Sequence, residues 1–197
     1  LTISIQIMGE VPAGLALKRS GAQLHDEIWV SGPLGLAALA LGQLQGKLSL
    51  SPNDFKRCSA ALHSPQPRVA LGYGLRSLAH SAIDISDGLL ADLSHILQAS
   101  HLGATLHLSQ WPHACHWPEA AGLDLPSQAK LLLSGGDDYE LCFTAPKASH
   151  DALLQLGNKL DLDLCCLGEI TQDPSLVVHG VDKAILDIKE LGFDHFK

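Results

Sequence analysis

Residues 82–97 read AIDISDGLLADLSHIL and contain an abrupt change of pattern. Residues 82–85 form a short apolar run that is typical of a strand, and they lead directly into Ser86-Asp87-Gly88. The apolar residues that follow recur at the 3.6-residue spacing of a helix, at Leu89, Leu90, Leu93, Ile96 and Leu97. A strand that turns into a helix at this point predicts an α/β or α+β fold, with packed helices layered on a mixed sheet.

Two carboxylates flank the turn, because Asp84 ends the expected strand and Asp87 opens the helix. At such a junction they can converge on a hard cation while the hydroxyl of Ser86 faces a phosphate oxygen. The N-terminus of the helix adds N–H groups and a partial positive charge, which favour an anion. The alternative is that Ser86 or Asp87 only caps the helix, and for the turn taken alone this is at least as good a reading.

Asp84 favours the metal hypothesis over simple capping. Since it stands between Ile83 and Ile85, we expect it to be buried, where an unpaired carboxylate is costly. A metal ion is one partner that would justify such a residue, and a buried arginine is another.

Outside this stretch, strand and helix patterns alternate loosely along the chain. A Ser-Pro pair at Ser51 and Pro52 marks one helix start, with serine as N-cap and proline at the first helical position. We read residues 109–126 as an irregular excursion. Strands are expected at 2–7, 27–30, 104–108, 141–144, 162–170, 176–178 and 184–188, and other helices at 35–44, 69–79 and 148–160.

The composition suits an ordered globular core, with 46% hydrophobic and 17% charged residues among 197. A formal charge of −8 and 13 scattered basic residues argue against a nucleic-acid partner. No apolar stretch approaches the roughly 20 residues that span a bilayer, so we expect no membrane partner. Five cysteines without a C-x-x-C pair indicate a reduced, cytoplasmic protein.

A second group of polar residues lies in the segment Ser134-Gly135-Gly136-Asp137-Asp138-Tyr139-Glu140. Its glycines allow close backbone approach, and its acids can bind a cationic ligand or a metal. For the segment taken in isolation, an ordinary turn with solvated acids is the favoured reading. Arg19 follows Lys18 before a turn, where it can clamp a nucleotide phosphate or simply remain a solvated charge.

Five stretches in this order resemble the thiamine-monophosphate kinase family, which belongs to the aminoimidazole-ribonucleotide-synthetase-like superfamily. They are VPAGLALKRSGA (11–22), PRVALG (67–72), IDISDGLLADL (83–93), SGGDDYEL (134–141) and GFDHF (192–196). The resemblance implies that residues 1–197 form the C-terminal α/β domain of such an enzyme. It also implies that an N-terminal dimerisation and nucleotide/metal domain is absent here, which agrees with a chain that opens in a strand pattern without an initiator Met.

The family resemblance implies a function: ATP-dependent phosphorylation of thiamine monophosphate to thiamine diphosphate, with Mg²⁺, by direct in-line transfer that needs no catalytic nucleophile from the protein. It also implies a homodimer for the full-length enzyme. The matching positions are Asp84 and Asp87 for magnesium, Ser86 and Arg19 for ATP, and Asp137 and Phe193 for the substrate.

Two alternatives remain open beside this function. The chain can be another ATP-using synthetase of the superfamily, or a non-catalytic fragment that binds nucleotide or metal. Because half of the composite site is expected upstream, we expect residues 1–197 alone to show no kinase activity. Asp137 stands where the family usually has Glu. Because Asp is one methylene shorter than Glu, the sequence does not decide whether Asp137 reaches the substrate.

Overall fold

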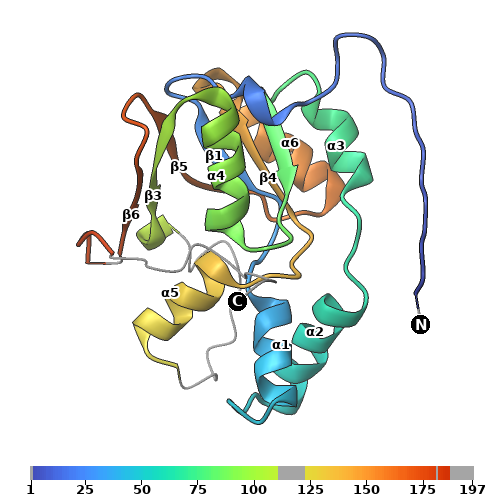
Figure 1. The fold of residues 1–197 in the computed structure, drawn as a ribbon, viewed down its shortest axis with the longest axis vertical. Helices are drawn as coiled ribbons and strands as arrows, with labels where there is room; N and C mark the ends of the chain where they lie inside the picture. Colours follow the sequence, from blue (N-terminus) through green and yellow to red (C-terminus); the bar gives the residue numbers. More distant parts are fainter. Residues whose placement is uncertain (1, 111–122, 181, 187–197) are drawn as a thin grey trace.

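The computed structural model describes residues 2–110, 123–180 and 182–186. Its centre is a six-stranded sheet with the strand order β2-β4-β1-β5-β3-β6 (Figure 1). The strands pair antiparallel, except that β3 and β6 are parallel, so the sheet is mixed as the sequence predicted. The strands are β1 (Glu27–Val30), β2 (Ser81–Asp84), β3 (Gly103–His107), β4 (Leu141–Ala145), β5 (Cys165–Thr171) and β6 (Leu176–His179).

Helices cover both faces of this sheet, with α4 on one face and α3 and α6 on the other (Figure 1). Alternation along β1 explains the two layers: Ile28 and Val30 enter the core under α4, while Trp29 enters the core under α3 and α6. The α/β class is confirmed. The helices are α1 (Leu36–Leu44), α2 (Pro52–His63), α3 (Val69–Leu75), α4 (Leu89–Ser100), α5 (Leu125–Ser134) and α6 (His150–Leu160).

The helices α1 and α2 pack on each other and form a third, smaller core beside the sheet. The predicted cap of α2 is confirmed, because the Ser51 side chain accepts a hydrogen bond from the backbone N–H of Asp54. None of the helices in the described ranges has both the length and the apolarity needed to cross a membrane.

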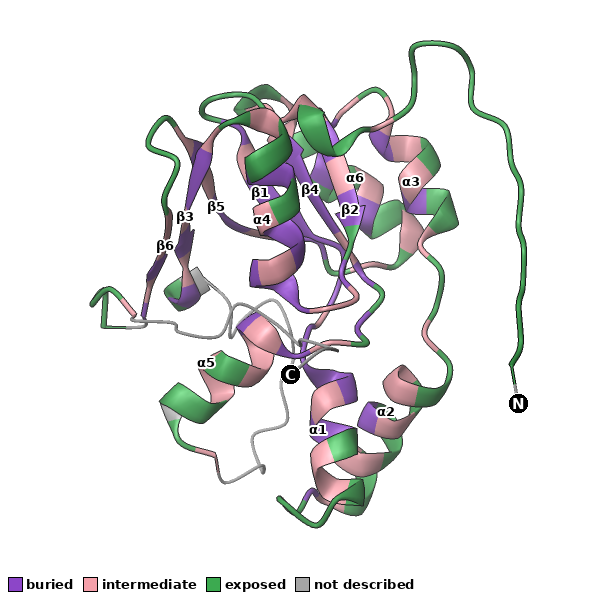
Figure 2. Cartoon of the chain, in the orientation of Figure 1, coloured by how far each residue is buried: buried purple, intermediate pink, exposed green. Residues whose placement is uncertain are grey.

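The strand predicted at residues 2–7 is wrong. Ile3, Ile5 and Ile7 are 75%, 89% and 93% exposed, and the segment runs along the outside of the molecule (Figure 2). Alternation alone does not make a strand, which also needs a neighbour for its backbone hydrogen bonds, and the described residues provide none here. The segment expected at 184–188 likewise contributes only an isolated bridge, at Ile185, within its described part.

Candidate functional site

The two motif segments of the sequence lie against each other beyond the ends of β2 and β4. Three backbone hydrogen bonds join them: Ile85 N to Glu140 O at 2.8 Å, Tyr139 N to Ile85 O at 2.8 Å, and Asp137 N to Ser86 O at 2.9 Å. These bonds extend the antiparallel ladder in which Asp84 is the partner of Leu141. The structure thus brings together four of the predicted site residues, Asp84, Ser86, Asp87 and Asp137.

Gly88 allows this close contact between the two segments. Its backbone has φ 116° and ψ 152°, a conformation that is essentially restricted to glycine. A Cβ at this position would lie 2.9 Å from the backbone carbonyl carbon of Ser134. In the structure, the missing side chain of Gly88 therefore makes room for the neighbouring segment.

Asp84 is exposed, which corrects the expectation that it is buried between two isoleucines. Ile83 and Ile85 are buried, but side chains alternate along a strand, and Asp84 ends a strand at the edge of the sheet. Its carboxylate therefore needs no buried partner. The case for a cation at this place depends instead on the other carboxylates that gather around it.

Asp92, which sequence reasoning missed, is the buried carboxylate of this site. It is 4% exposed, and its Oδ2 accepts hydrogen bonds from Ser86 N at 2.9 Å and Asp87 N at 3.0 Å. These two N–H groups are satisfied internally, whereas the sequence predicted N–H groups open to an anion. The signal was present in the sequence, since Asp92 lies on the apolar stripe of α4 between Leu89 and Leu93.

Burial raises the pKa of Asp92, against the opposing effect of those two backbone hydrogen bonds, and the charges of Asp87 and Asp84 raise it further. Three carboxylates therefore lie within electrostatic reach of one another at the start of α4. Such a concentration of negative charge favours a cation.

Tyr139 connects this group to Asp137. Its hydroxyl donates a hydrogen bond to Asp137 Oδ1 at 3.3 Å. Burial raises the pKa of Tyr139, and the charges of Asp137, Asp84 and Asp87 raise it further. The phenol of Tyr139 is therefore close enough to three carboxylates to feel their charge. All three are exposed or half-buried, and all three come from the two joined segments.

A magnesium ion needs oxygen ligands, which the carboxylates at this place can supply. Over the described residues, no group of three or more His, Cys, Asp or Glu side chains is arranged to hold a metal. Asp84 and Asp87 offer two carboxylates. Mg²⁺ is usually bound by one or two carboxylates and completes its octahedron with waters and substrate phosphates. The residues present fit a magnesium ion that is shared with a phosphate ligand.

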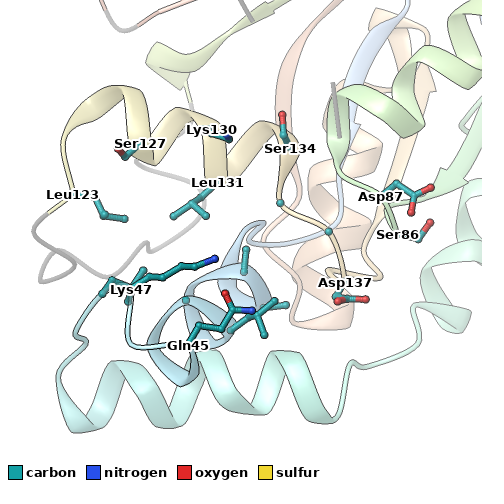
Figure 3. A pocket seen from close by; sticks show the side chains of 17 residues that line it. Gln45, Lys47, Ser86, Asp87, Leu123, Ser127, Lys130, Leu131, Ser134 and Asp137 are labelled. Atoms are coloured by element: carbon teal, nitrogen blue, oxygen red, sulfur yellow. The ribbon is translucent and has the colours of Figure 1, made fainter. Parts of the chain in front are cut away.

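A cavity of about 570 Å³ opens beside the carboxylates, between α1 and α5 (Figure 3). Ser86, Asp87 and Asp137 lie on one side of it, and Lys47 and Lys130 on the other. The size is typical of a site for a small organic molecule. Apolar side chains form much of the wall between these polar sides, namely Ala37, Ala38, Leu41, Leu48, Leu123 and Leu131.

Arg19 is not brought to this site. It begins a short 3-10 helix, η1 (Arg19–Gly21), at the opposite end of α4, where Ser100 Oγ donates a hydrogen bond to Arg19 O at 3.1 Å. The 12 residues of α4, a helix about 18 Å long at 1.5 Å per residue, lie between this hydrogen bond and the turn that contains Ser86. Its role as a nucleotide ligand stays a prediction. Phe193, the second predicted substrate contact, lies outside the described residues.

The family model described as AIR synthase related protein, C-terminal domain, matches residues 24–181. The chain belongs to this family. Curated relatives include the thiamine-monophosphate kinases of Escherichia coli K12, 39% identical over 200 residues, and of Haemophilus influenzae, 37% identical over 203 residues. Each match covers 100% of this chain and 60% of the relative, so the chain spans less than two thirds of the length of these relatives.

Solved structures show the same family fold. A crystal structure of thiamine-monophosphate kinase from Stenotrophomonas maltophilia K279a has a TM-score of 0.79 and 43% identity, over 86% of this chain and 55% of that chain. The protein AaThiL, complexed with AMPPCP and TMP, has a TM-score of 0.69 and 25% identity, over 90% and 54%. The hydrogenase maturation protein HypE of E. coli, at 16% identity, shares the fold alone.

Asp138 is a further buried acid that sequence reasoning did not single out, and it yields a prediction about stability. Its two carboxylate oxygens accept the N–H of Gly35 at 2.9 and 3.0 Å. Burial raises the pKa of Asp138 well above its usual range; the Gly35 hydrogen bond opposes this rise, and the charges of Glu140 and Asp137 add to it.

We expect Asp138→Asn to flatten the pH dependence of stability. A raised pKa means that the folded protein binds this proton more tightly than the unfolded chain, so stability is fully present below the unfolded pKa of 3.8 and is lost as the pH rises through the folded value. Urea unfolding at several pH values above 4 should show a smaller loss for the variant. Asp161→Asn, at an exposed helix end, is the control; parallel curves for wild type and Asp138→Asn would contradict the assignment.

Proposed function

We propose that this chain supplies the C-terminal half of the active site of an ATP-dependent thiamine-monophosphate kinase. The reaction transfers the γ-phosphoryl group of ATP to thiamine monophosphate, which gives thiamine diphosphate and ADP. The observation that carries the proposal is the ladder between residues 83–88 and 134–140, which brings the carboxylates of Asp84, Asp87 and Asp137 and the hydroxyl of Ser86 together beside a cavity. The curated relatives of that name, and a related protein complexed with AMPPCP and TMP, support it.

Phosphoryl transfer depends on positioning and on the neutralisation of charge, so the carboxylates have a clear use. Asp84 and Asp87 would hold magnesium, which neutralises phosphate oxygens when it is bound. The hydroxyl of Ser86, next to both, donates a hydrogen bond to a phosphate oxygen. Because an acceptor phosphate is already ionised at neutral pH, the chain needs to supply neither a nucleophile nor a strong general base.

The acceptor is proposed to lie in the cavity between α1 and α5. Its apolar walls suit the ring systems of thiamine monophosphate, and Asp137 at one side suits the positive charge of the thiazolium ring. In this placement the phosphate of the acceptor points toward Ser86 and Asp87, where the transferred group arrives. Asp137 then holds the substrate by charge, although it is shorter than the family's usual Glu.

The rest of the site is proposed to come from an N-terminal domain outside this chain, which also forms the interface of a homodimer. Support for the further domain comes from the relatives, of whose length the chain covers 60%, and from the matching family model, which is that of a C-terminal domain. We further propose a cytoplasmic location, and three cysteines of the described residues support it, because Cys58, Cys142 and Cys166 are free thiols, as is usual in a reducing compartment.

A product assay tests the proposed function. The full-length protein is incubated with ATP, Mg²⁺ and thiamine monophosphate, and the products are separated by chromatography. Thiamine diphosphate and ADP should form in equal amounts, and EDTA should stop the reaction. Residues 1–197 alone should form neither product. The proposal would be overturned if the full-length protein made no thiamine diphosphate, or if it released AMP instead of ADP.

A further inference from the structure

We propose that a cluster around the buried carboxylate of Glu140, the Glu140 clamp, positions the catalytic segments without touching the substrate. The clamp consists of Glu140, Arg68 and Ser31. Its expected effect on turnover rests on the proposed kinase function, whereas its effect on the local structure does not.

Three hydrogen bonds hold the Glu140 carboxylate in one place. Arg68 grips it with two nitrogens, with Nε donating to Oε2 at 2.7 Å and Nη2 donating to Oε1 at 2.5 Å. Ser31 Oγ donates to Oε2 at 2.5 Å and itself accepts the N–H of Leu141 at 2.7 Å. Glu140 is 7% exposed, so these bonds are largely shielded from water. A two-pronged arginine–carboxylate contact fixes direction as well as distance.

The clamp joins three parts of the chain that are distant in sequence. Ser31 follows β1, Arg68 precedes α3, and Glu140 precedes β4. The packing around the carboxylate is tight, because a Cβ on Gly32 would lie 2.8 Å from Glu140 Oε1. The carboxylate therefore has little freedom to move, and it fixes where the segment 134–140 meets the rest of the domain.

The backbone of Glu140 transmits this position to the site. Its carbonyl oxygen accepts the N–H of Ile85, and the ladder continues through Tyr139 to Asp137. Asp84 and Ser86 flank Ile85 directly. A shift of Glu140 would therefore move Asp137 relative to Ser86, and phosphoryl transfer is sensitive to displacements of this kind.

Stability alone does not explain a charged clamp at this place. A buried ion pair can often be replaced by apolar residues of similar volume at no loss of stability, while removal of one partner leaves an uncompensated charge. A variant in which both charged partners are replaced by apolar residues can therefore distinguish a positioning role from a structural one. The single variants Glu140→Gln and Arg68→Met are expected to fold poorly. The double variant Arg68→Met/Glu140→Met should keep most of the stability of the wild type, since its remaining cost is the lost acceptor of the Ser31 hydroxyl, and should have mispositioned segments.

The test compares this double variant with the wild type in the full-length protein. At saturating ATP and thiamine monophosphate, kcat should fall at least about tenfold, as is typical when residues that orient the groups in contact with the ligand are removed. The thermal unfolding temperature should stay close to that of the wild type. Amide hydrogen exchange should speed up in peptides that cover residues 83–88 and 134–140, and not in β1. The matched control is Lys147→Met/Glu169→Met, which removes an exposed ion pair between Lys147, shortly after β4, and Glu169 on β5, and which should change neither kcat nor the exchange rates.

The possible outcomes separate the two proposals. If kcat stays within about twofold of the wild type, or if only KM changes, the clamp does not position catalytic groups. If the wild type makes no thiamine diphosphate, the proposed function fails, and the exchange experiment alone decides about the clamp. In that case, unchanged amide exchange in both segments of a folded double variant would overturn the proposed role of the Glu140 clamp.

Discussion

Replacing Asp84 by Asn in the full-length protein is expected to lower kcat about 100-fold or more, with little effect on the fold. The change removes one of two carboxylates proposed to hold magnesium, and a bound cation contributes several kcal/mol to the stabilisation of charge in phosphoryl transfer. Asp84 is exposed at the end of an edge strand, so the amide is easily accommodated. Steady-state kinetics at saturating ATP and Mg²⁺ measures the loss.

The control for this variant is Asp173→Asn, which also neutralises an exposed carboxylate. Asp173 accepts the N–H of Ser175 in a turn far along the chain, and Asn can accept the same bond. Its kcat should match that of the wild type. Wild-type turnover by Asp84→Asn would count directly against a metal at this position.

Replacing Gly88 by Ala is expected to destabilise the protein by about 2–4 kcal/mol and to reduce activity in the fraction that folds. Alanine does not tolerate the glycine conformation at φ 116°, and strain of this kind costs about 1–3 kcal/mol. The new methyl would also overlap the backbone of Ser134, so the two joined segments must separate. Urea unfolding measures the stability, and kcat is measured on folded protein.

Gly72→Ala is the matched control for Gly88→Ala. Gly72 lies in α3, and a Cβ there would meet nothing within 4 Å. Alanine should stabilise the protein by about 0.5–1 kcal/mol. The reason is that alanine has less conformational freedom than glycine in the unfolded chain, so less entropy is lost on folding. If Gly88→Ala were as stable as Gly72→Ala, the close contact between the segments would be wrong.

The sequence predicted the layered fold well, because the decisive signals were local. The 3.6-residue stripe after Gly88 predicted α4, and the Ser51-Pro52 pair predicted the start of α2. Residues 2–7 show where a local signal is insufficient, since alternation does not say whether a neighbouring strand exists. The helix predicted at 69–79 is shorter in the structure, where α3 ends at Leu75. The apolar pattern continues past Leu75, and a local pattern does not show where a helix ends.

The residues of the candidate site were visible in the sequence only in part. The sequence singled out Asp84, Asp87 and Asp137, which are exposed or half-buried and whose chemistry is visible from residue type and motif. It missed the buried acids Asp92, Asp138 and Glu140, because their roles depend on partners distant in the chain, such as Arg68, 72 residues away from Glu140. Only the folded structure shows that Asp84 is exposed and that Arg19 lies at the other end of α4.

Terbium luminescence is the most direct test of the proposed binding of a cation by Asp84 and Asp87 next to Tyr139. Tb³⁺ prefers carboxylate oxygens, as Ca²⁺ and Mg²⁺ do, and a nearby tyrosine can excite it. The full-length protein should show tyrosine-excited emission that Mg²⁺ suppresses and that is lost in both Tyr139→Phe and Asp84→Asn/Asp87→Asn. Emission that persists unchanged in the Asp84→Asn/Asp87→Asn variant would contradict the account.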